Sequence, residues 1–318
     1  MSRPLPAAAQ AAVAALAAAG LTVLAACGTP SAGGGSAAGA GTGPGPAGSV
    51  TVVAAGDIST CPGPDCGAAQ TATLVESIDP DAVLTLGDNQ YPDGALSAFR
   101  TSYAKTWGRF VDVTHPVPGN HEYYASERAS GYFDFFGAAA HPGSNGYYSF
   151  DLGDWHLVAL NSNDGCELLA CDASSAQQRW LADDLARNDA SCTLAYWHHP
   201  RWSTGEHGDT ESSDGLWRTA ADGGVDLVLN GHDHDYERFA ARDAAGAADG
   251  QGTVEIVAGT GGAELRDFTA PADPLTETRV AGRSGVLRLD LGDGSYRWQF
   301  VAVGGEVLDE GRADCALR

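Results

Sequence analysis

The chain has 318 residues and a formal net charge of −23. The chain is strongly acidic and has no basic stripe that could contact the phosphates of a nucleic acid. We therefore do not expect nucleic acid or an anionic membrane surface as its main partner. No stretch after residue 26 is long and apolar enough to cross a bilayer.

The N-terminal residues 1–26 are mostly Ala with Leu and Val, and Arg3 is their only charged side chain. An apolar run behind one basic residue is typical of a secretory signal. The run ends in Leu24-Ala25-Ala26-Cys27, which resembles a bacterial lipoprotein cleavage site. Cleavage there would leave Cys27 to carry a lipid anchor. A membrane-spanning anchor and a plain secretory signal with a chance cysteine are the alternatives.

After Cys27, residues 28–49 are all Gly, Ala, Ser, Thr or Pro. Such a segment buries too little apolar surface to offset its ordering entropy, so residues 27–49 are predicted to be a flexible tether. We therefore expect an extracytoplasmic protein, either a cell-surface lipoprotein or secreted, that meets a membrane only through Cys27. Residues 50–318 remain, a length that fits one large α/β domain or two small ones. We assign this range to one catalytic domain.

Six cysteines lie beyond Cys27, at positions 61, 66, 166, 171, 192 and 315. An even number in an exported chain predicts disulfides, although six cysteines allow fifteen pairings. Two pairs each enclose four residues, so we propose Cys61–Cys66 and Cys166–Cys171, which leaves Cys192–Cys315 to tie the C-terminus to the core. A structural zinc site is the alternative, but neither close pair has the usual spacing of two residues.

Short apolar runs that end at glycine or polar residues are predicted to be buried strands. They are residues 50–55, 82–86, 192–197 and 225–229. Helical spacing predicts helices over residues 68–78, 174–187 and 214–221. Alternating residues 286–291 and 296–301, separated by a turn at 292–294, predict a hairpin. This mixture of βαβ units and hairpins predicts an α/β fold of packed sheets flanked by helices.

Reactive side chains stand at or just beyond the ends of these predicted strands. They are Asp57, Asp88, His198 and His232. In open α/β sheets, ligand sites are built at the carboxyl ends of strands. We therefore expect these four side chains to converge on one crevice.

Five short segments in strand-to-loop positions carry the candidate chemistry. They are Gly56-Asp57, Gly87-Asp88-Asn89-Gln90-Tyr91, Gly119-Asn120-His121-Glu122, His198-His199-Pro200 and Gly231-His232-Asp233-His234. Each alone is more often an ordinary turn or an exposed loop. Together they supply carboxylates, a phenol, an amide oxygen and imidazoles, a mixture that suits two hard or borderline metal ions. The sequence thus predicts a dinuclear metal site.

The order and spacing of these segments resemble the calcineurin-like metallophosphoesterase superfamily, and most of all its purple acid phosphatase branch. The resemblance runs through scattered motifs from Gly56 to Arg238, and it is especially close over residues 231–238. It implies an αββα sandwich, in which two packed mixed β-sheets are flanked by helices. It also implies hydrolysis of small phosphate esters.

The resemblance also implies a role for each matching residue. Asp88 corresponds to the carboxylate that bridges both metals. The remaining ligands of one metal would be Asp57, Tyr91 and His234, and those of the other would be Asn120, His198 and His232. His199 is a rival to His198, but the family pattern places the ligand two residues before Pro200.

Tyr91 distinguishes the branch. Most of the superfamily has Asp-x-His in the first motif, whereas this chain has Asp57-Ile58-Ser59 and lacks that histidine. In purple acid phosphatases, a tyrosine in Gly-Asp-x-x-Tyr compensates and binds ferric iron. The resemblance therefore implies iron at the Tyr91 site, with iron, zinc or manganese at the other. Ser59 departs from the branch, which usually has glycine there. A pocket-lining role is the alternative for Tyr91.

Two metal ions would neutralise phosphoryl charge and yield a metal-bound hydroxide for direct in-line attack on the ester. The leaving group would need a proton or a positive neighbour, and His121 and His207 are the candidates. His121 could instead orient a ligand. We expect an acid phosphatase that cleaves phosphomonoesters.

Two other functions fit parts of the sequence. A phosphodiesterase or nucleotidase would use the same centre, because the motifs determine the phosphoryl chemistry and not the specificity for the alcohol. That specificity depends on loops, which the motifs do not describe. A non-catalytic surface lipoprotein that binds metal or solute would also suit the acidic charge and tether.

Arg238 could contact substrate or pair with Glu237 or Asp235. Four tryptophans, Trp107, Trp155, Trp180 and Trp217, are predicted to line the core or a pocket wall.

Overall fold

The computed structural model describes residues 48–63, 65–141, 143, 146–163 and 175–316. All of them fall in the unit that spans Ala37–Arg318. The predicted signal, Cys27, nearly all of the tether and the Cys166–Cys171 pair lie outside the described residues. Within the described ranges, no helix is both long and apolar enough to cross a membrane.

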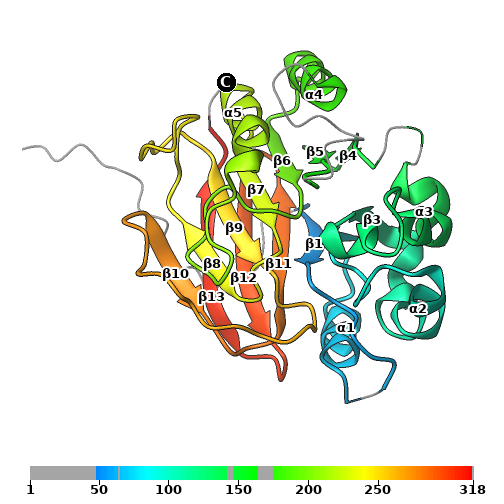
Figure 1. Ribbon diagram of the computed structural model, residues 1–318. Coiled ribbons are helices and arrows are strands. Elements are labelled where there is room, and N and C mark those ends of the chain that lie inside the picture. Colours follow the sequence, from blue (N-terminus) through cyan, green and yellow to red (C-terminus); the bar gives the residue numbers. More distant parts are fainter. Residues whose placement is uncertain (1–47, 64, 142, 144–145, 164–174, 317–318) are drawn as a thin grey trace, which may run out of the picture. The chain divides into compact units, whose positions relative to one another are not determined.

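The strands form two mixed sheets (Figure 1). The first has the order β13-β12-β11-β1-β2-β3 and the second the order β10-β8-β9-β7-β6-β5-β4. The strands of the first sheet are β1 Val50–Ala55, β2 Ala82–Leu86, β3 Thr114–Val117, β11 Gly285–Gly292, β12 Ser295–Ala302 and β13 Val307–Asp314. Those of the second are β4 Tyr148–Leu152, β5 Trp155–Ala159, β6 Cys192–Tyr196, β7 Leu227–Asn230, β8 Tyr236–Phe239, β9 Val254–Ala258 and β10 Thr276–Val280.

Side-chain alternation along the strands creates one core between the sheets and one outside each. Along β1, Val52 and Ala54 belong to a cluster that contains residues of both sheets, such as Leu194 and Leu287. Val53, next to them, faces the opposite way, into a second cluster. Successive strand residues point to opposite faces, so an almost continuous apolar run buries both sides of the sheet.

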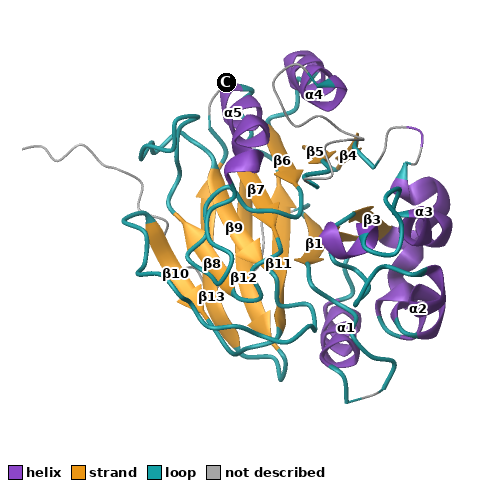
Figure 2. Cartoon of the chain, in the orientation of Figure 1, coloured by secondary structure: helices purple, strands orange, loops and turns teal. Residues whose placement is uncertain are grey.

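Helices cover the two outer faces (Figure 2). The helices are α1 Gly67–Ile78, α2 Leu96–Thr101, α3 Ser130–Phe136, α4 Ala176–Arg187 and α5 Asp214–Asp222. Short 3₁₀ turns are η1 Tyr103–Lys105, η2 Trp107–Val113, η3 Asn120–Tyr123, η4 Gly137–Ala140 and η6 Glu211–Ser213. Residues of α1, α2 and α3 share the cluster outside β1 and β2, and α4 and α5 pack outside β5, β6 and β7. The predicted αββα sandwich is confirmed.

Most predicted elements appear within two residues of their expected ends. The predicted hairpin is β11 and β12, paired in register from Gly285 opposite Ala302 to Gly292 opposite Ser295. The predicted helix at 174–187 begins at Ala176, because the Ser175 hydroxyl accepts a hydrogen bond from the Gln178 backbone N–H and caps it. Edge strands such as β10 and β13, with many half-buried side chains, were not predicted. Three of the four tryptophans are buried, and Trp180 packs half-buried against the α4–α5 cluster.

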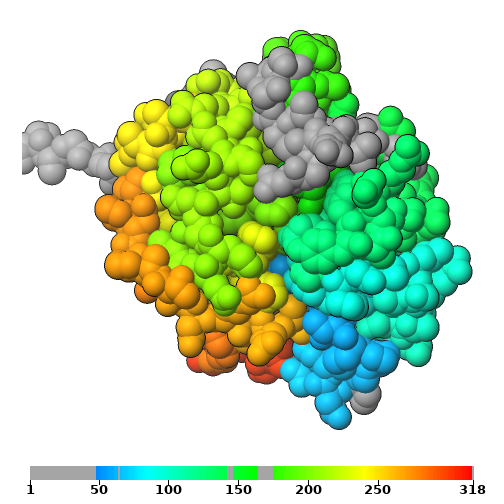
Figure 3. Space-filling view, in the orientation of Figure 1, coloured from blue at the N-terminus to red at the C-terminus, as the bar shows by residue number. Residues whose placement is uncertain are grey.

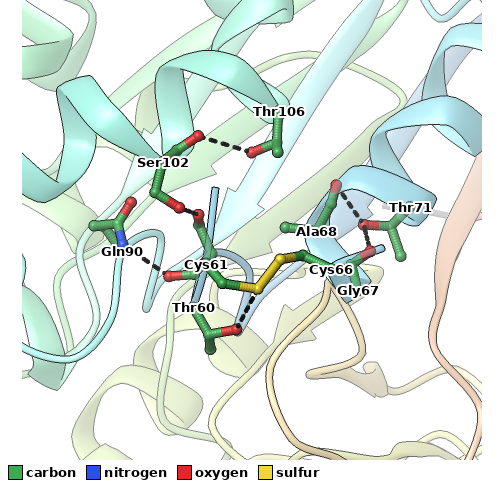
Figure 4. The surroundings of a disulfide bond; sticks show 10 residues. Thr60, Cys61, Cys66, Gly67, Ala68, Thr71, Gln90, Ser102 and Thr106 are labelled. Atoms are coloured by element: carbon green, nitrogen blue, oxygen red, sulfur yellow. Dashed lines mark hydrogen bonds between the residues drawn. A yellow bond between two sulfur atoms is a disulfide. The ribbon is translucent and has the colours of Figure 1, made fainter. Parts of the chain in front are cut away.

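Two of the predicted disulfides lie in the described residues, and both are confirmed. Cys192 at the start of β6 bonds to Cys315, one residue after β13, and so joins the two sheets. Cys61 bonds to Cys66 just before α1 (Figure 4). Beside this loop the Ser59 hydroxyl lies 2.7 Å from that of Ser102. The small loop thus packs against a part of the chain that is distant in sequence.

Candidate metal centre

The candidate ligands follow strands of both sheets. Asp57 and Asp88 stand two residues after the parallel strands β1 and β2, and His198 and His232 stand two residues after the parallel strands β6 and β7. Asn120 begins the turn that follows β3. Carboxyl ends of neighbouring parallel strands lie at one edge of a sheet, so these side chains reach the same region.

The surface on this side is hollowed (Figure 3). In that view, a small patch of blue from the first part of the described chain shows at depth, between the green and the yellow-to-orange segments. The floor is buried, since Asp57 and His198 have no exposed surface and Asp88 has 2%. Tyr124 stands out from this surface with 62% of its area exposed.

One group of side chains converges on the phenol of Tyr91. Its hydroxyl oxygen lies 2.8 Å from Asp57 Oδ1, 2.9 Å from Asp88 Oδ2 and 3.1 Å from His234 Nε2. A single hydroxyl proton cannot serve two carboxylates and an imidazole at once. Four ligand atoms gathered in this way fit a cation between them.

A second group forms around the other oxygen of Asp88. His198 Nε2 lies 3.1 Å from Asn120 Oδ1 and 3.5 Å from Asp88 Oδ1. The His232 ring is 5.0 Å from that of His198, between centroids. The two carboxylate oxygens of Asp88 therefore face different groups, as a bridging ligand requires.

His199 also lies close to this second group. The ligand atoms of His198, His199 and His232 all fall within 4.8 Å of one another. His199 Nδ1 is 2.9 Å from the Ser162 hydroxyl, whereas His198 Nε2 meets Asn120 and Asp88. The contacts with two further candidate ligands favour His198 over His199.

Backbone carbonyls orient three of the histidines. The Nδ1–H groups of His198, His234 and His121 donate to carbonyl oxygens at 2.8, 2.5 and 2.6 Å respectively. Each ring therefore turns its Nε2 toward the candidate centre. Metal-binding histidines commonly donate their other N–H to a carbonyl or carboxylate in this way.

Three candidate ligands have left-handed backbone conformations that side chains rarely adopt. The φ angles are 59° at Asp57, 48° at Asp88 and 72° at His232. Such a conformation costs on the order of 1–3 kcal/mol for a residue other than glycine, and it collects at functional sites. The surrounding fold therefore holds these side chains where local preference alone would not.

Glycines allow the backbone to approach the two carboxylates. A Cβ on Gly119 would lie 2.2 Å from Asp88 Oδ1, and one on Gly231 would lie 2.7 Å from Asp57 Oδ2. Gly259, far along the chain at the end of β9, would place a Cβ 2.8 Å from the same Asp57 oxygen. The first two belong to the predicted segments. Gly259 was missed because nothing local marks it as part of the site.

Electrostatics favour an ionised carboxylate at the centre. Burial raises the pKa of Asp88, but attraction to His198 and a hydrogen bond from it, with a smaller effect of His121, outweigh burial and hold this pKa well below its usual range. Burial lowers the pKa of His198, but the attraction of Asp88 and the hydrogen bond to it outweigh burial and raise this pKa to about 9. His232 faces other histidines, so burial and their repulsion lower its pKa. The low pKa of Asp88 and the raised pKa of His198 thus favour a charged pair, whereas the lowered pKa of His232 favours a neutral imidazole.

The two predicted catalytic histidines contact different candidate ligands. His121 Nε2 lies 3.7 Å from Asp88 Oδ2, and its ring lies between those of Tyr91 and Tyr124, at 4.2 and 4.6 Å. The His207 ring stacks on that of His232 with centroids 4.2 Å apart. Both therefore lie next to candidate ligands.

Sequence reasoning missed three partners of these residues. Asp233 Oδ1 accepts the Nδ1–H of His207 at 3.0 Å, and Arg266 Nη1 donates to His207 Nε2 at 2.9 Å. The Tyr124 hydroxyl accepts from Asn120 Nδ2 at 2.7 Å. Asp233 lies inside one of the five segments but was given no role there, and no local pattern distinguishes Arg266.

Acidic residues shape the loop that carries His207. The Asp233 carboxylate accepts the His207 backbone N–H at 2.8 Å, and Glu237 accepts that of Thr204 at 2.8 Å. Glu255, from β9, accepts two more from the start of the loop. Buried backbone N–H groups need such partners, so these carboxylates fix the loop conformation.

The predicted pairing of Arg238 with Glu237 or Asp235 is wrong. Arg238 Nε donates to Asp309 at 2.7 Å, and its Nη1 bonds to Glu277. Both acceptors lie far along the chain: Glu277 is on β10, which pairs with β8, and Asp309 is on β13 of the other sheet. The neighbouring acidic residues point elsewhere because successive strand residues face opposite sides.

Comparison with known proteins agrees with this geometry. Residues 50–236 match the Metallophos family, described as calcineurin-like phosphoesterase. Two Arabidopsis thaliana relatives are purple acid phosphatase 15 and purple acid phosphatase 22. The first is 32% identical over 219 residues, covering 58% of this chain and 40% of the relative; the second is 29% identical over 253 residues, covering 71% and 55%. The chain thus spans about half the length of these curated relatives.

Two solved structures share the fold. Purple acid phosphatase PPD1 from yellow lupin superposes with a TM-score of 0.66 at 18% identity, covering 85% of this chain and 54% of that one. GAP50 of Plasmodium, described as the anchor in the inner membrane complex, superposes with a TM-score of 0.61 at 13% identity, covering 85% and 90%. At such identities the likeness concerns the fold alone.

Proposed function

Because the chain belongs to the calcineurin-like phosphoesterase family, we propose that it is a dinuclear metal-dependent phosphoesterase of the purple acid phosphatase type, acting on phosphomonoesters. The observation that carries this proposal is the convergence of Asp57, Asp88 and His234 on the Tyr91 hydroxyl. A tyrosine at this place suits iron, because phenol and carboxylate oxygens are hard ligands.

The side chains divide into two ligand sets with one shared member. Asp57, Tyr91 and His234 would hold one ion and Asn120, His198 and His232 the other, with Asp88 between them. Ions bound there would supply Lewis-acid chemistry, which neutralises phosphoryl charge and lowers the pKa of water. The buried carboxylates and the inward-facing Nε2 atoms keep this region ready for cations.

The flanking histidines take different roles in this proposal. His121 is 24% exposed, and its Nδ1–H is held by the Pro92 carbonyl, so its Nε2 is the atom that would deliver a proton to the leaving alcohol when the ring is doubly protonated. His207 Nε2 accepts from Arg266 and in this arrangement has no proton to give at that atom. His207 would act as a donor only after Arg266 moves away.

The two disulfides in the described residues support a place outside the cytoplasm, where disulfides persist. Export of the chain, with or without a lipid on Cys27, belongs to the same proposal. Mass spectrometry of the cell-associated protein would identify a lipidated Cys27.

Metal content and ester preference test the function together. Exported protein with intact disulfides should bind two metals per chain, including iron, and hydrolyse an aryl phosphate monoester. Tyr91→Phe should lose iron selectively. Two metals without iron would retain the phosphoesterase and remove the purple-phosphatase type. Faster turnover of diesters or nucleotides would reassign the substrate, and a metal-loaded chain inert to all three would leave a binding protein.

A further inference from the structure

The backbone of Arg266 is hydrogen-bonded to that of His234, a candidate metal ligand. Its backbone N–H donates to the carbonyl oxygen of His234 at 3.1 Å. Two residues earlier, the Glu264 carbonyl accepts the Nδ1–H of the same histidine at 2.5 Å. The segment from Glu264 to Arg266 therefore runs directly beside His234, although it lies on a loop far from the predicted motifs.

The Arg266 side chain extends from there toward the second ligand set. Its Nη1 donates to His207 Nε2 at 2.9 Å, and the His207 ring stacks on His232 at 4.2 Å. The Arg266 backbone thus lies beside His234, and its guanidinium lies beside His207, which stacks on His232. Its guanidinium lies at the rim of the candidate centre.

The guanidinium has hydrogen-bond donors to spare. Of its five N–H groups, one bonds to His207, and the Nε faces Glu206 at 3.6 Å, which is longer than a hydrogen bond. The Nη2 atom has no hydrogen-bond partner among the residues that the structure describes. By contrast, Arg238 is committed to two carboxylates. With 31% of its side chain exposed, Arg266 can turn donors toward a ligand in the hollow.

We propose that Arg266 binds the phosphoryl group of the substrate and makes the site selective for terminal phosphate groups. This inference rests on the function proposed above. A guanidinium donates charge-assisted hydrogen bonds to phosphoryl oxygens, and selectivity requires an unesterified oxygen beyond the two that would face the metals. A phosphomonoester has three unesterified oxygens and so keeps one for Arg266, whereas a diester has only two.

The acidic charge of the whole chain gives such a cation a further role. A net charge of −23 repels an approaching dianion, and a fixed positive charge at the rim offsets that repulsion locally. The Arg266 donor at Nε2 agrees with the proton that the Asp233 carboxylate holds on His207 Nδ1. In this state His207 positions Arg266 by accepting its hydrogen bond.

Calorimetric titration of the metal-loaded full chain with inorganic phosphate tests the proposal. Arg266→Gln should weaken phosphate binding about 10- to 100-fold, the range for hydrogen bonds to charged groups, and Arg266→Lys should lose less. Binding of dimethyl phosphate, with two unesterified oxygens, should change less than binding of phosphate. Metal content should stay at the wild-type value.

Arg283→Gln is the matched control, since it removes the same charge from a surface arginine that pairs with Glu306. Equal phosphate affinity of Arg266→Gln and Arg283→Gln would overturn the proposal. If the wild type neither binds phosphate nor hydrolyses esters, the proposed function itself fails; if the wild type is active and Arg266→Gln matches it, only this inference fails.

Discussion

The Asp233 carboxylate holds His207 at two points through one oxygen. Asp233 Oδ1 accepts the His207 backbone N–H at 2.8 Å and the ring Nδ1–H at 3.0 Å. Asp233 is completely buried, and its other oxygen accepts a hydrogen bond from Ser203. Position and tautomer of His207 are therefore set by a residue located between two candidate ligands.

Asp233→Asn should lower turnover by up to about 100-fold, because an amide can present its NH₂ to the His207 ring and turn it. Steady-state kinetics with an aryl phosphate, alongside metal analysis, would measure this. Asp235→Asn is the control, since neither oxygen of Asp235 has a hydrogen-bond partner among the described residues. A loss of activity that simply follows a loss of metal would assign Asp233 to metal retention instead.

Tyr124→Phe should weaken the second metal by about 10- to 100-fold, the usual effect of removing a residue that orients a ligand. The Tyr124 hydroxyl accepts from Asn120 Nδ2, and this turns Asn120 Oδ1 toward His198. Competition with a chelator would give the affinity. Tyr123→Phe is a matched control, because the Tyr123 hydroxyl bonds to Asn161 and not to a candidate ligand. Equal affinities for both variants would remove this role.

Gly119→Ala should destabilise the protein by about 1–3 kcal/mol, the usual cost of overpacking, and should reduce metal binding. The added Cβ would lie 2.2 Å from Asp88 Oδ1 and 2.3 Å from the Asp88 backbone N, so a buried carboxylate must move. Chemical denaturation and metal analysis would test both effects. Gly250→Ala, where nothing lies within 4 Å of the new atom, should change neither.

His156 should make stability depend on pH at a place away from the candidate centre. His156 donates a hydrogen bond to Asp184 at 2.9 Å and another to Asp151 at 2.7 Å, and these bonds outweigh burial and raise the pKa of His156. A raised pKa in the folded state stabilises the protein below the unfolded value of 6.5, and this contribution is lost as pH rises through the folded value.

The comparison of wild type with His156→Gln isolates this effect. The difference in the free energy of unfolding should be largest near pH 6 and should shrink by pH 9. Denaturation in urea at both pH values, at one fixed metal content, would measure it. A difference that is constant with pH would mean that the charge on His156 contributes nothing.

Much of the fold could be predicted because its signals are local. Runs such as residues 50–55 and 82–86 are apolar except for one threonine each and are followed by glycine, which marks strands buried on both faces. Edge strands such as β10 lack that pattern, since half-exposed side chains can be polar. The pairing of Cys192 with Cys315 followed from elimination among the cysteines, and the structure confirms it.

The sequence by itself determined which chemistry is available and where along the chain it lies: carboxylates, a phenol, an amide and imidazoles that directly follow strands. Only the tertiary structure decided how these groups meet, since Tyr91 reaches His234 across 143 positions and Arg266 reaches His207 across 59. A side chain's residue type and local backbone are encoded nearby. Its hydrogen-bond partners, and therefore its tautomer and pKa, depend on segments that only folding brings together.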